Sequence, residues 1–336
     1  ACTALAVSRL PGVPESPTWP ELAHFLEHGC RYSTPREDPD LGHLHWATTR
    51  RPQPETVMAL AIDHRAQLEA IADAAMVSRE RIDPFKTLAV RAAVQVARDR
   101  PGFGMLLDGT YGRHALLAAS HHPLWLARPV EQPGSRPLRF DSYEDLGSQL
   151  IEWPATHTIK CLCFYHPEDP RELKAEQERM LRCVFEAARR IGRELLIEII
   201  AGKSGPLSEG TVAEVLSRLY DLGIRPDWWK LEPQRSAQAW RRIGETIAER
   251  DPLCCGVILL GLEAPAAELQ EAFREAASVP QVRGFAVGRT IFAEAANKWL
   301  RGQIDDDGAV KLMASAFGNL VEAWQSARKA VTGNAS

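Results

Sequence analysis

The amino-acid sequence predicts an α/β fold, a (β/α)8 TIM barrel with an N-terminal extension. Three observations support this prediction. Eight short apolar runs follow one another between residues 56 and 288, longer stretches of helical periodicity separate most of them, and about 270 residues is the usual size of such a barrel. Strands that alternate with helices form parallel βαβ units. A doubly wound open sheet is the alternative, but no glycine-rich phosphate fingerprint follows the first run.

The first 54 residues differ from the rest because prolines crowd them. One short helix is expected from Trp19 to His28, with Thr18 as its N-cap and Gly29 as its stop. A polar linker is expected over residues 31–41, and much of this region is expected to be peripheral and partly mobile. We therefore divide the chain into an extension, residues 1–54, and a barrel domain, residues 55–330.

Each apolar run is too short for an ordinary helix and is typical of a buried strand. The runs are TVMALAID (56–63), FGMLLD (103–108), LWLARPVE (124–131), THTIKCLCF (156–164), ELLIEIIA (194–201), PDWWKLE (226–232), GVILLGLE (256–263) and VRGFAVG (282–288). Helical stretches between them include HRAQLEAIADAA (64–75), RELKAEQERMLRCVFEAARRIG (171–192), EGTVAEVLSRLYDLG (209–223) and AAELQEAFREAA (266–277).

Composition excludes several classes of protein. The chain has 336 residues, 40 Lys and Arg against 44 Asp and Glu, and a hydrophobic fraction of 45%, which is ordinary for a globular protein. No apolar run approaches the roughly 20 residues of a membrane span, and the near-neutral charge argues against a nucleic-acid partner. We therefore predict neither a membrane nor a nucleic acid as partner.

The seven cysteines fit neither a disulfide framework nor a zinc site. They are Cys2, Cys30, Cys161, Cys163, Cys183, Cys254 and Cys255. Cys161 and Cys163 lie in an apolar run and Cys254-Cys255 precedes another, so these are predicted to be buried free thiols, which indicates a reducing cytoplasm. The chain begins ACTALAVSR, without Met or a signal-peptide pattern, so we expect a fragment of a longer or processed protein.

Charged residues sit in or just after several of the predicted strands. Asp63 ends the first run, Lys160 lies in the fourth, Glu198 in the fifth, and Lys230 and Glu232 in the sixth. Because the carboxyl ends of all strands meet at one end of a barrel, these groups are expected to share a site there. Alternation places Lys230, Glu232 and Trp228 on one side of their strand, and Trp229 and Leu231 on the side of the helices. A structural network of ion pairs is the alternative interpretation.

A buried lysine has a use in catalysis. Burial and a neighbouring cation lower the pKa of an amine, and a free amine can form a Schiff base with a ketone. On this hypothesis Lys230 and Lys160 are the paired lysines, Glu198 moves protons during imine formation, and Asp63 takes a hydroxyl proton. No H-E-x-x-H motif occurs and no strand end offers two histidines with a carboxylate. We predict no cofactor and no metal.

Six segments carry a family resemblance. They are ALAIDHR (59–65), GMLLDGTYG (104–112), IKCLCFYHPED (159–169), LLIEIIAGK (195–203), PDWWKLEP (226–233) and GFAVGRTIF (284–292). The chain resembles the class I aldolases of the tagatose-bisphosphate aldolase type. It more closely resembles the aldolase module fused behind a sugar kinase in bacterial myo-inositol catabolism, because LAVSRLPGVPESPTWPEL (5–22) is similar to the last strand and helix of a ribokinase-like kinase.

The resemblance implies cleavage of 2-deoxy-5-keto-gluconate 6-phosphate to dihydroxyacetone phosphate and malonate semialdehyde. It implies that Lys230 is the Schiff-base lysine, Lys160 the assisting lysine, Glu198 the acid/base, Asp63 the first-strand carboxylate, and Arg289 the phosphate-binding residue. Two departures, Trp228-Trp229 around the lysine and Gly261-Leu262-Glu263 after the seventh strand, leave the choice of substrate open. The extension lacks any kinase motif, so kinase activity is not expected from this chain.

Further residues are predicted to bind substrate. The loops after the last two strands of such barrels commonly hold phosphate, which points to Gly261, Gly288 and Arg289; pairing of Arg289 with Glu263 is the alternative. A second anion on the substrate would need a cation elsewhere, and Arg65, Arg113 and Lys203 are the candidates, although each could be a solvated charge. Glu232 joins the substrate-binding candidates.

Three functions remain open at this point. The first is a class I aldolase acting on a phosphorylated keto-acid, with a tagatose or other ketose bisphosphate as the alternative substrate. The second is a non-catalytic barrel that regulates a fused sugar kinase. The third is a metal-dependent aldolase or isomerase. We also expect a homo-oligomer.

Overall fold

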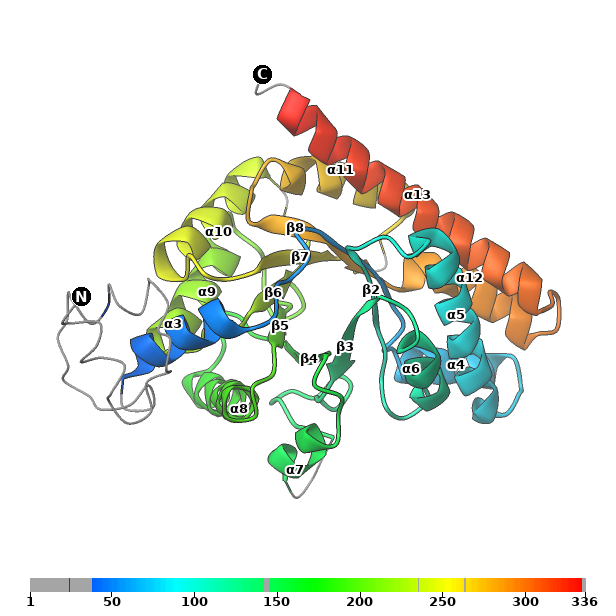
Figure 1. The fold of residues 1–336 in the computed structure, drawn as a ribbon, viewed down its shortest axis with the longest axis horizontal. Helices are drawn as coiled ribbons and strands as arrows, with labels where there is room; N and C mark the ends of the chain where they lie inside the picture. The colour runs from blue at the N-terminus through cyan, green and yellow to red at the C-terminus, as the bar shows by residue number, and fades with distance from the viewer. Residues whose placement is uncertain (1–23, 25–37, 142–144, 235, 263, 334–336) are drawn as a thin grey trace.

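Eight parallel strands close into a barrel in chain order, with β8 returning to pair with β1 (Figure 1). The computed structural model describes residues 24, 38–141, 145–234, 236–262 and 264–333. The strands are β1 (Val57–Ala61), β2 (Phe103–Leu106), β3 (Trp125–Pro129), β4 (His157–Cys163), β5 (Leu195–Ile199), β6 (Trp228–Leu231), β7 (Gly256–Leu260) and β8 (Val282–Val287). Each lies inside one predicted apolar run, so the predicted TIM barrel is confirmed.

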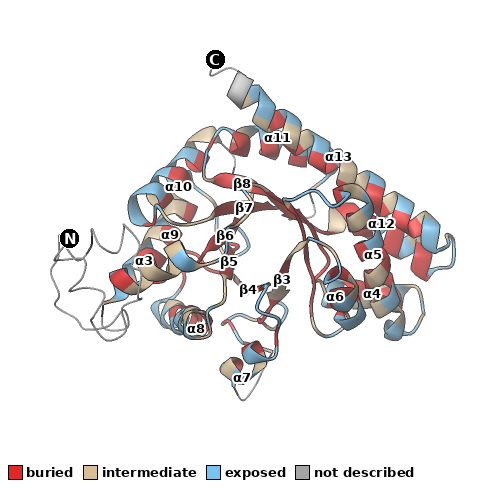
Figure 2. Ribbon diagram, in the orientation of Figure 1, coloured by how far each residue is buried: buried red, intermediate tan, exposed pale blue. Residues whose placement is uncertain are grey.

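Helices surround the barrel and bury one face each (Figure 2). They are α3 (Pro39–Thr49), α4 (Ala66–Ala74), the 3-10 turn η1 (Arg79–Arg81), α5 (Ile82–Ala97), α6 (Arg113–Ala119), α7 (Leu146–Ile151), α8 (Arg171–Arg190), α9 (Thr211–Asp221), α10 (Ala237–Arg250), α11 (Ala266–Ala277), α12 (Arg289–Leu300) and α13 (Asp306–Gly333). The long α13 runs across the outside of the barrel against α5, α11 and α12 (Figure 1).

Strand alternation divides the core into two layers. A small inner cluster fills the barrel itself and includes Ala59, Leu196 and Trp228. A much larger outer cluster lies between the strands and the helices and includes Trp229 and Leu231. The predicted facing of these three β6 residues is therefore confirmed, and Lys230 belongs to the inner side.

The seam between β1 and β8 is unusually close. Gly284 pairs with Val57 across it, and a Cβ atom built on Gly284 would lie 1.8 Å from the carbonyl oxygen of Val57. No side chain fits in that space, so glycine is what lets the last strand reach the first.

The structure corrects the prediction for residues 31–41. A helix, α3, begins at Pro39, inside the predicted linker. Asp38 is its N-cap, with a side-chain oxygen that accepts from the backbone N–H groups of Asp40 and Leu41. Proline at the first helical position after such a cap favours a helix rather than a loop. The helix predicted over residues 19–28 lies outside the described residues except for His24.

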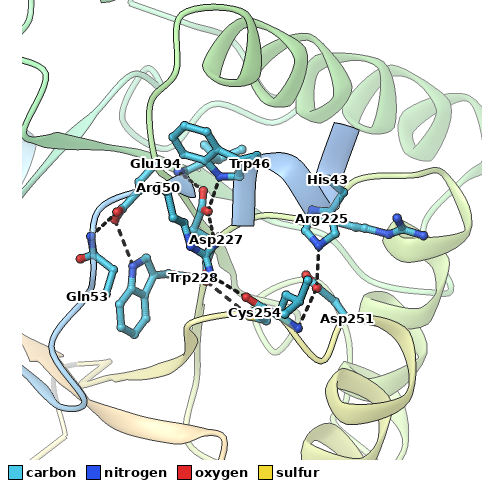
Figure 3. Close-up of polar contacts among 12 residues, drawn as sticks. His43, Trp46, Arg50, Gln53, Glu194, Arg225, Asp227, Trp228, Asp251 and Cys254 are labelled. Carbon is cyan, nitrogen blue, oxygen red and sulfur yellow. Dashed lines mark hydrogen bonds and ion pairs between the residues drawn. The ribbon is translucent and has the colours of Figure 1, made fainter. Parts of the chain in front are cut away.

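Helix α3 is also not peripheral, because the segment fastens to the amino-terminal end of the barrel (Figure 3). Trp46 Nε1 donates to Asp227 at 2.7 Å, and Arg50 forms an ion pair with the same carboxylate. Arg189 of α8 donates to it as well, at 2.9 Å. Asp227 directly precedes β6, so the segment before β1 is tied to the amino-terminal end of β6. The boundary at residue 54 stays a prediction.

The five cysteines among the described residues are free, but their burial varies. Cys161 and Cys163 on β4 are buried as predicted, whereas Cys254 and Cys255 are half-buried and Cys183 is exposed on α8. Cys2 and Cys30 lie outside the described residues. None of the described helices combines the length and apolar character needed to cross a bilayer.

Candidate active site

A cavity of about 210 Å³ opens at the carboxyl ends of the strands. Nine of the predicted site residues line it, namely Asp63, Arg65, Lys160, Glu198, Lys203, Lys230, Gly261, Gly288 and Arg289. They come from six strands (β1 and β4 to β8) and the loops that follow them, which is the usual construction of a TIM-barrel site. The sequence therefore identified most of the charged residues of this cavity.

Lys160 is the centre of the charge cluster. Its Nζ lies 2.6 Å from Glu131 Oε1, 2.9 Å from Glu198 Oε2 and 3.3 Å from Asp63 Oδ2. Burial alone would lower the pKa of this amine, but the three carboxylates outweigh burial and hold the pKa of Lys160 well above its ordinary value. Lys160 is therefore held as an ammonium, next to the carboxylate that it shares with Lys230.

Glu198 joins the two lysines. Its second oxygen, Oε1, lies 3.0 Å from Lys230 Nζ. Glu198 and Lys230 are direct partners in the β5–β6 register, so the pairing follows from the sheet itself. Burial would raise the pKa of Glu198, but the charges of Lys160 and Lys230 outweigh it and lower that pKa. The ionised carboxylate thus lies within hydrogen-bond distance of both lysine nitrogens.

The two remaining carboxylates differ in their electrostatics. Burial would raise the pKa of Asp63, but Lys160 and Lys230 hold that pKa well below its usual range. At Glu131 burial prevails over Lys160, the negative charge of Asp63 adds to it, and the pKa is raised. One cluster therefore contains a firmly ionised carboxylate and one that binds a proton more readily.

The opposite wall of the cavity is formed by the loops after β7 and β8. Gly288 is the N-cap of α12, which begins at Arg289, and Thr290 donates to the carbonyl of Ala264 at 2.9 Å. A Cβ on Gly288 would lie 2.4 Å from His64 and 2.5 Å from the Ala61 carbonyl, so only glycine lets the loop approach β1. Partial burial lowers the pKa of Arg289. Glu263, its alternative partner, lies outside the described residues.

The other predicted substrate-binding residues are placed unequally. Arg65 pairs with Asp141 and donates to the Glu131 carbonyl, so its guanidinium is largely committed to the protein. Lys203 lines the cavity with its ammonium 5.7 Å from the Phe164 ring. Arg113 and Glu232 are not among the lining residues.

Glu232 has a structural explanation. Its carboxylate accepts hydrogen bonds from the backbone N–H groups of Ala201 and Gly202, at 2.7 and 2.9 Å. It thereby holds the loop after β5, from which Lys203 projects. Strand alternation predicted that Glu232 would share a side with Lys230. However, β6 ends at Leu231, and the Glu232 side chain turns to the loop after β5.

Two titratable lining residues, Glu131 and His64, were missed by the sequence analysis. Glu131 ends the third apolar run, so the rule that identified Asp63 could have found it. His64 lies next to Asp63 and packs edge-on against Phe292. Burial, with the charges of Lys230 and Arg289, lowers the pKa of His64 to about 4, so the ring is neutral near pH 7.

Beneath these groups lies a fully buried ion pair. Lys86 of α5 pairs with Asp108 at the end of β2 and donates to the His64 carbonyl at 3.0 Å. The other oxygen of Asp108 accepts from the N–H groups of Thr110 and Tyr111. This pair supports the loops after β1 and β2. The described residues contain no group of three or more His, Cys, Asp or Glu side chains that could hold a metal ion.

Fold and site together define a TIM-barrel protein with a buried lysine–carboxylate cluster at the carboxyl ends of its strands, an arrangement compatible with an enzyme. The chain belongs to the family described as "Uncharacterized protein conserved in bacteria (DUF2090)", which matches residues 21–328. No curated protein matches it.

Among solved structures, Cgl0159 from Corynebacterium glutamicum (Brevibacterium flavum), a Northeast Structural Genomics target, is similar to this chain with 18% identity and a TM-score of 0.52. The match covers 89% of this chain and 97% of that one. At this identity the similarity shows the fold alone.

Proposed function

We propose that the protein is a class I aldolase, which cleaves a carbon–carbon bond through a Schiff base on Lys230. The observation that carries the proposal is the shared carboxylate: Glu198 lies 2.9 Å from Lys160 Nζ and 3.0 Å from Lys230 Nζ. Of the two lysines, Lys160 is held as an ammonium by three carboxylates. Lys230 has one carboxylate partner among the described residues, which supports it as the nucleophile.

The chemistry then follows in balanced steps. Lys230 Nζ attacks the ketone carbon, and Glu198 moves the proton that converts the new hydroxyl into a leaving water. When Asp63 removes the proton of the β-hydroxyl, the bond between the α- and β-carbons breaks, its electron pair passes to the iminium to give an enamine, and the β-carbon leaves as an aldehyde. Protonation of the enamine and hydrolysis of the imine by water return the free lysine and release the ketone product.

Lys160 and Glu131 serve this sequence by charge. The Lys160 ammonium lies between Asp63 and Glu198, where it stabilises negative charge as each carboxylate gives or takes its proton. Glu131 holds the ammonium from the third side at 2.6 Å. Preorganised charge of this kind lowers the barrier without movement of the protein.

The anion sites favour a phosphorylated keto-acid. Arg289 with Gly288 at the start of α12 suits the phosphate. On the other side, Arg65 is committed to Asp141, which leaves Lys203. One ammonium suits a carboxylate, whereas a second phosphate would draw on two or three cations. We therefore propose 5-dehydro-2-deoxyphosphogluconate aldolase activity, with cleavage of 2-deoxy-5-keto-gluconate 6-phosphate to dihydroxyacetone phosphate and malonate semialdehyde.

Borohydride trapping tests the chemistry. The protein incubated with dihydroxyacetone phosphate and reduced with borohydride should gain one covalent adduct, which peptide mass spectrometry should place on Lys230. Lys230→Met is the matched control and should gain none. An unmodified wild-type protein would favour the non-catalytic barrel, and activity abolished by a chelator would favour the metal-dependent alternative.

A substrate comparison tests the specificity separately. We expect a higher kcat/KM for the keto-acid phosphate than for tagatose or fructose bisphosphate. If the bisphosphates are cleaved equally well or better while Lys230 is still trapped, the Schiff-base chemistry stands and the substrate assignment is wrong.

A further inference from the structure

A second cavity lies at the opposite end of the barrel. Its volume is about 310 Å³, which reaches the lower end of the range for small-molecule sites, about 300–1,000 Å³. The residues that define it, here called the floor cavity, are Trp46, Gln53, Trp125, His157, Thr158 and Glu194. They lie at or just before the amino-terminal ends of β3, β4 and β5 and on the segment that precedes β1. None of them lines the cavity of the candidate active site.

Two indole rings give the floor cavity apolar walls. Trp125 packs edge-on against Trp228, with ring centroids 6.0 Å apart. Trp46 is held in place by its hydrogen bond to Asp227 (Figure 3). Rings fixed in this way are rigid contact surfaces, against which the C–H face of a ligand can pack at little entropic cost.

Polar groups accompany the rings. Gln53 Nε2 and Thr158 Oγ1 donate to the Glu194 carboxylate. His157 is 4% exposed, and its Nδ1 has no hydrogen-bond partner among the described residues; the same holds for Trp125 Nε1. Burial, with the charges of Arg128 and Arg193, lowers the pKa of His157 to about 4, so its ring is neutral. Buried polar atoms without partners are rare, and here they are neutral donors and acceptors.

The charges around the floor cavity select against an ion. The Arg50 guanidinium, which lines the cavity, is paired with Asp227, and the Glu194 carboxyl in the same wall opposes the binding of an anion. Arg51, which also lines the cavity, is exposed to water. The charges of Arg128 and Arg193, which act on His157, make a cation unfavourable. An uncharged ligand with several hydroxyl groups meets these conditions, because hydroxyls both donate and accept.

We infer that the floor cavity is a binding site for a small uncharged polyhydroxylated ligand, the size of a hexose, a hexitol or a cyclic hexitol. The ligand packs on Trp46 and Trp125 and exchanges hydrogen bonds with His157, Thr158, Gln53 and Glu194. The inference is independent of the proposed aldolase activity, since it uses none of the residues of that site.

Calorimetric titration of the full chain tests the inference. The probes are D-glucose, D-galactose, D-mannitol, D-sorbitol and a set of cyclic hexitols, with inorganic phosphate as the charged competitor. At least one neutral probe should bind with a dissociation constant of about 1 mM or tighter, and phosphate should neither bind there nor displace it.

Variants assign the binding to the floor cavity. His157→Phe should weaken binding about tenfold or more, and the isosteric Thr158→Val should weaken it several-fold, since each loses a hydrogen bond to the ligand. His121→Phe, a matched change at an exposed histidine in the turn before β3, should bind like wild type. Thr158→Val keeps the test decisive if His157→Phe does not fold.

Three results would each overturn the inference. They are no binding of any neutral probe at about 20 mM, binding that both variants leave unchanged, and phosphate binding that the variants abolish while the neutral probes stay silent.

Discussion

The two ends of the barrel treat buried charge in opposite ways. At the carboxyl ends of the strands, the buried carboxylates Asp63, Glu131 and Glu198 meet lysines. At the amino-terminal end, Asp227 meets two arginines, Arg50 and Arg189. A lysine can lose its proton and form covalent bonds, whereas a guanidinium stays charged. The difference teaches that the groups at one end are chemically able to exchange protons, whereas those at the other end hold a segment in place.

Replacing the lysine of β6 should break the comparison most strongly. Lys230→Met removes the proposed nucleophile. Lys230→Arg places a guanidinium beside Glu198, as Arg50 and Arg189 do beside Asp227, and a guanidinium cannot form the Schiff base. Both should lower kcat by about 10⁴-fold or more, as losses of covalent catalysts do, with the circular dichroism spectrum unchanged. Activity of Lys230→Arg near the wild-type level would exclude the Schiff base at this residue.

Asp227→Asn should produce the largest loss of stability. The substitution leaves Arg50 and Arg189 buried without their counter-charge, and breaking such a pair costs about 3–5 kcal/mol of unfolding free energy. Urea denaturation measures it. Asp221→Asn is the control, because its pair with Arg250 is substantially exposed and should contribute less than about 1 kcal/mol. Equal losses in the two variants would show that the α3 segment is not held by Asp227.

Arg289→Ala should act on substrate binding. We expect the KM for a phosphorylated substrate to rise about 10- to 100-fold, in keeping with the loss of a charge-assisted contact of roughly 1.5–3 kcal/mol. A substrate analogue without phosphate should be affected far less. Arg301→Ala, an exposed arginine at the other end of α12, is the control. Equal losses on both substrates would indicate a structural role for Arg289.

The last prediction concerns the pH dependence of stability that the Glu194 carboxyl of the floor cavity produces. Burial and the charge of Asp227 raise the pKa of Glu194 to about 7 from an ordinary 4.5. Between those values the folded protein binds a proton that the unfolded chain does not, so stability from this group falls as the pH rises from about 4.5 to 7. Relative to Glu194→Gln, the wild type should lose about 3 kcal/mol at most over that window, at roughly 1.4 kcal/mol for each pKa unit. A constant difference between the two proteins would contradict the shift.

The residues at the carboxyl ends of the strands were predicted better from the sequence than those at the amino-terminal end of the barrel. Asp63, Lys160, Glu198 and Lys230 could be found because a barrel brings the ends of all its strands together, so position in a run is enough. Partners could not be found in this way. Arg65 commits its guanidinium to Asp141, a residue on a loop whose path no periodicity encodes.

The contacts of α3 at the amino-terminal end of the barrel were missed for a related reason. Arg50 and Asp227 lie 177 positions apart, and no local pattern in either segment predicts that they form an ion pair. The Asp38-Pro39 start of α3 was readable as a capped helix, but the abundance of proline around it favoured a linker instead. The local sequence thus contained a signal for helix α3, but none for its contacts with Asp227.

Gly284 in β8 and Gly288 just after it limit which substitutions the contact between β1 and β8 can accept. Gly284 faces the Val57 carbonyl and Gly288 faces both His64 and the Ala61 carbonyl, each at distances that even a methyl group cannot occupy. A mutation to alanine at either position forces β1 and β8 apart, and Asp63 stands at the end of β1. Alanine at either position should therefore disturb the place of Asp63, whereas a substitution at Lys203 or Leu262 leaves the contact between β1 and β8 untouched.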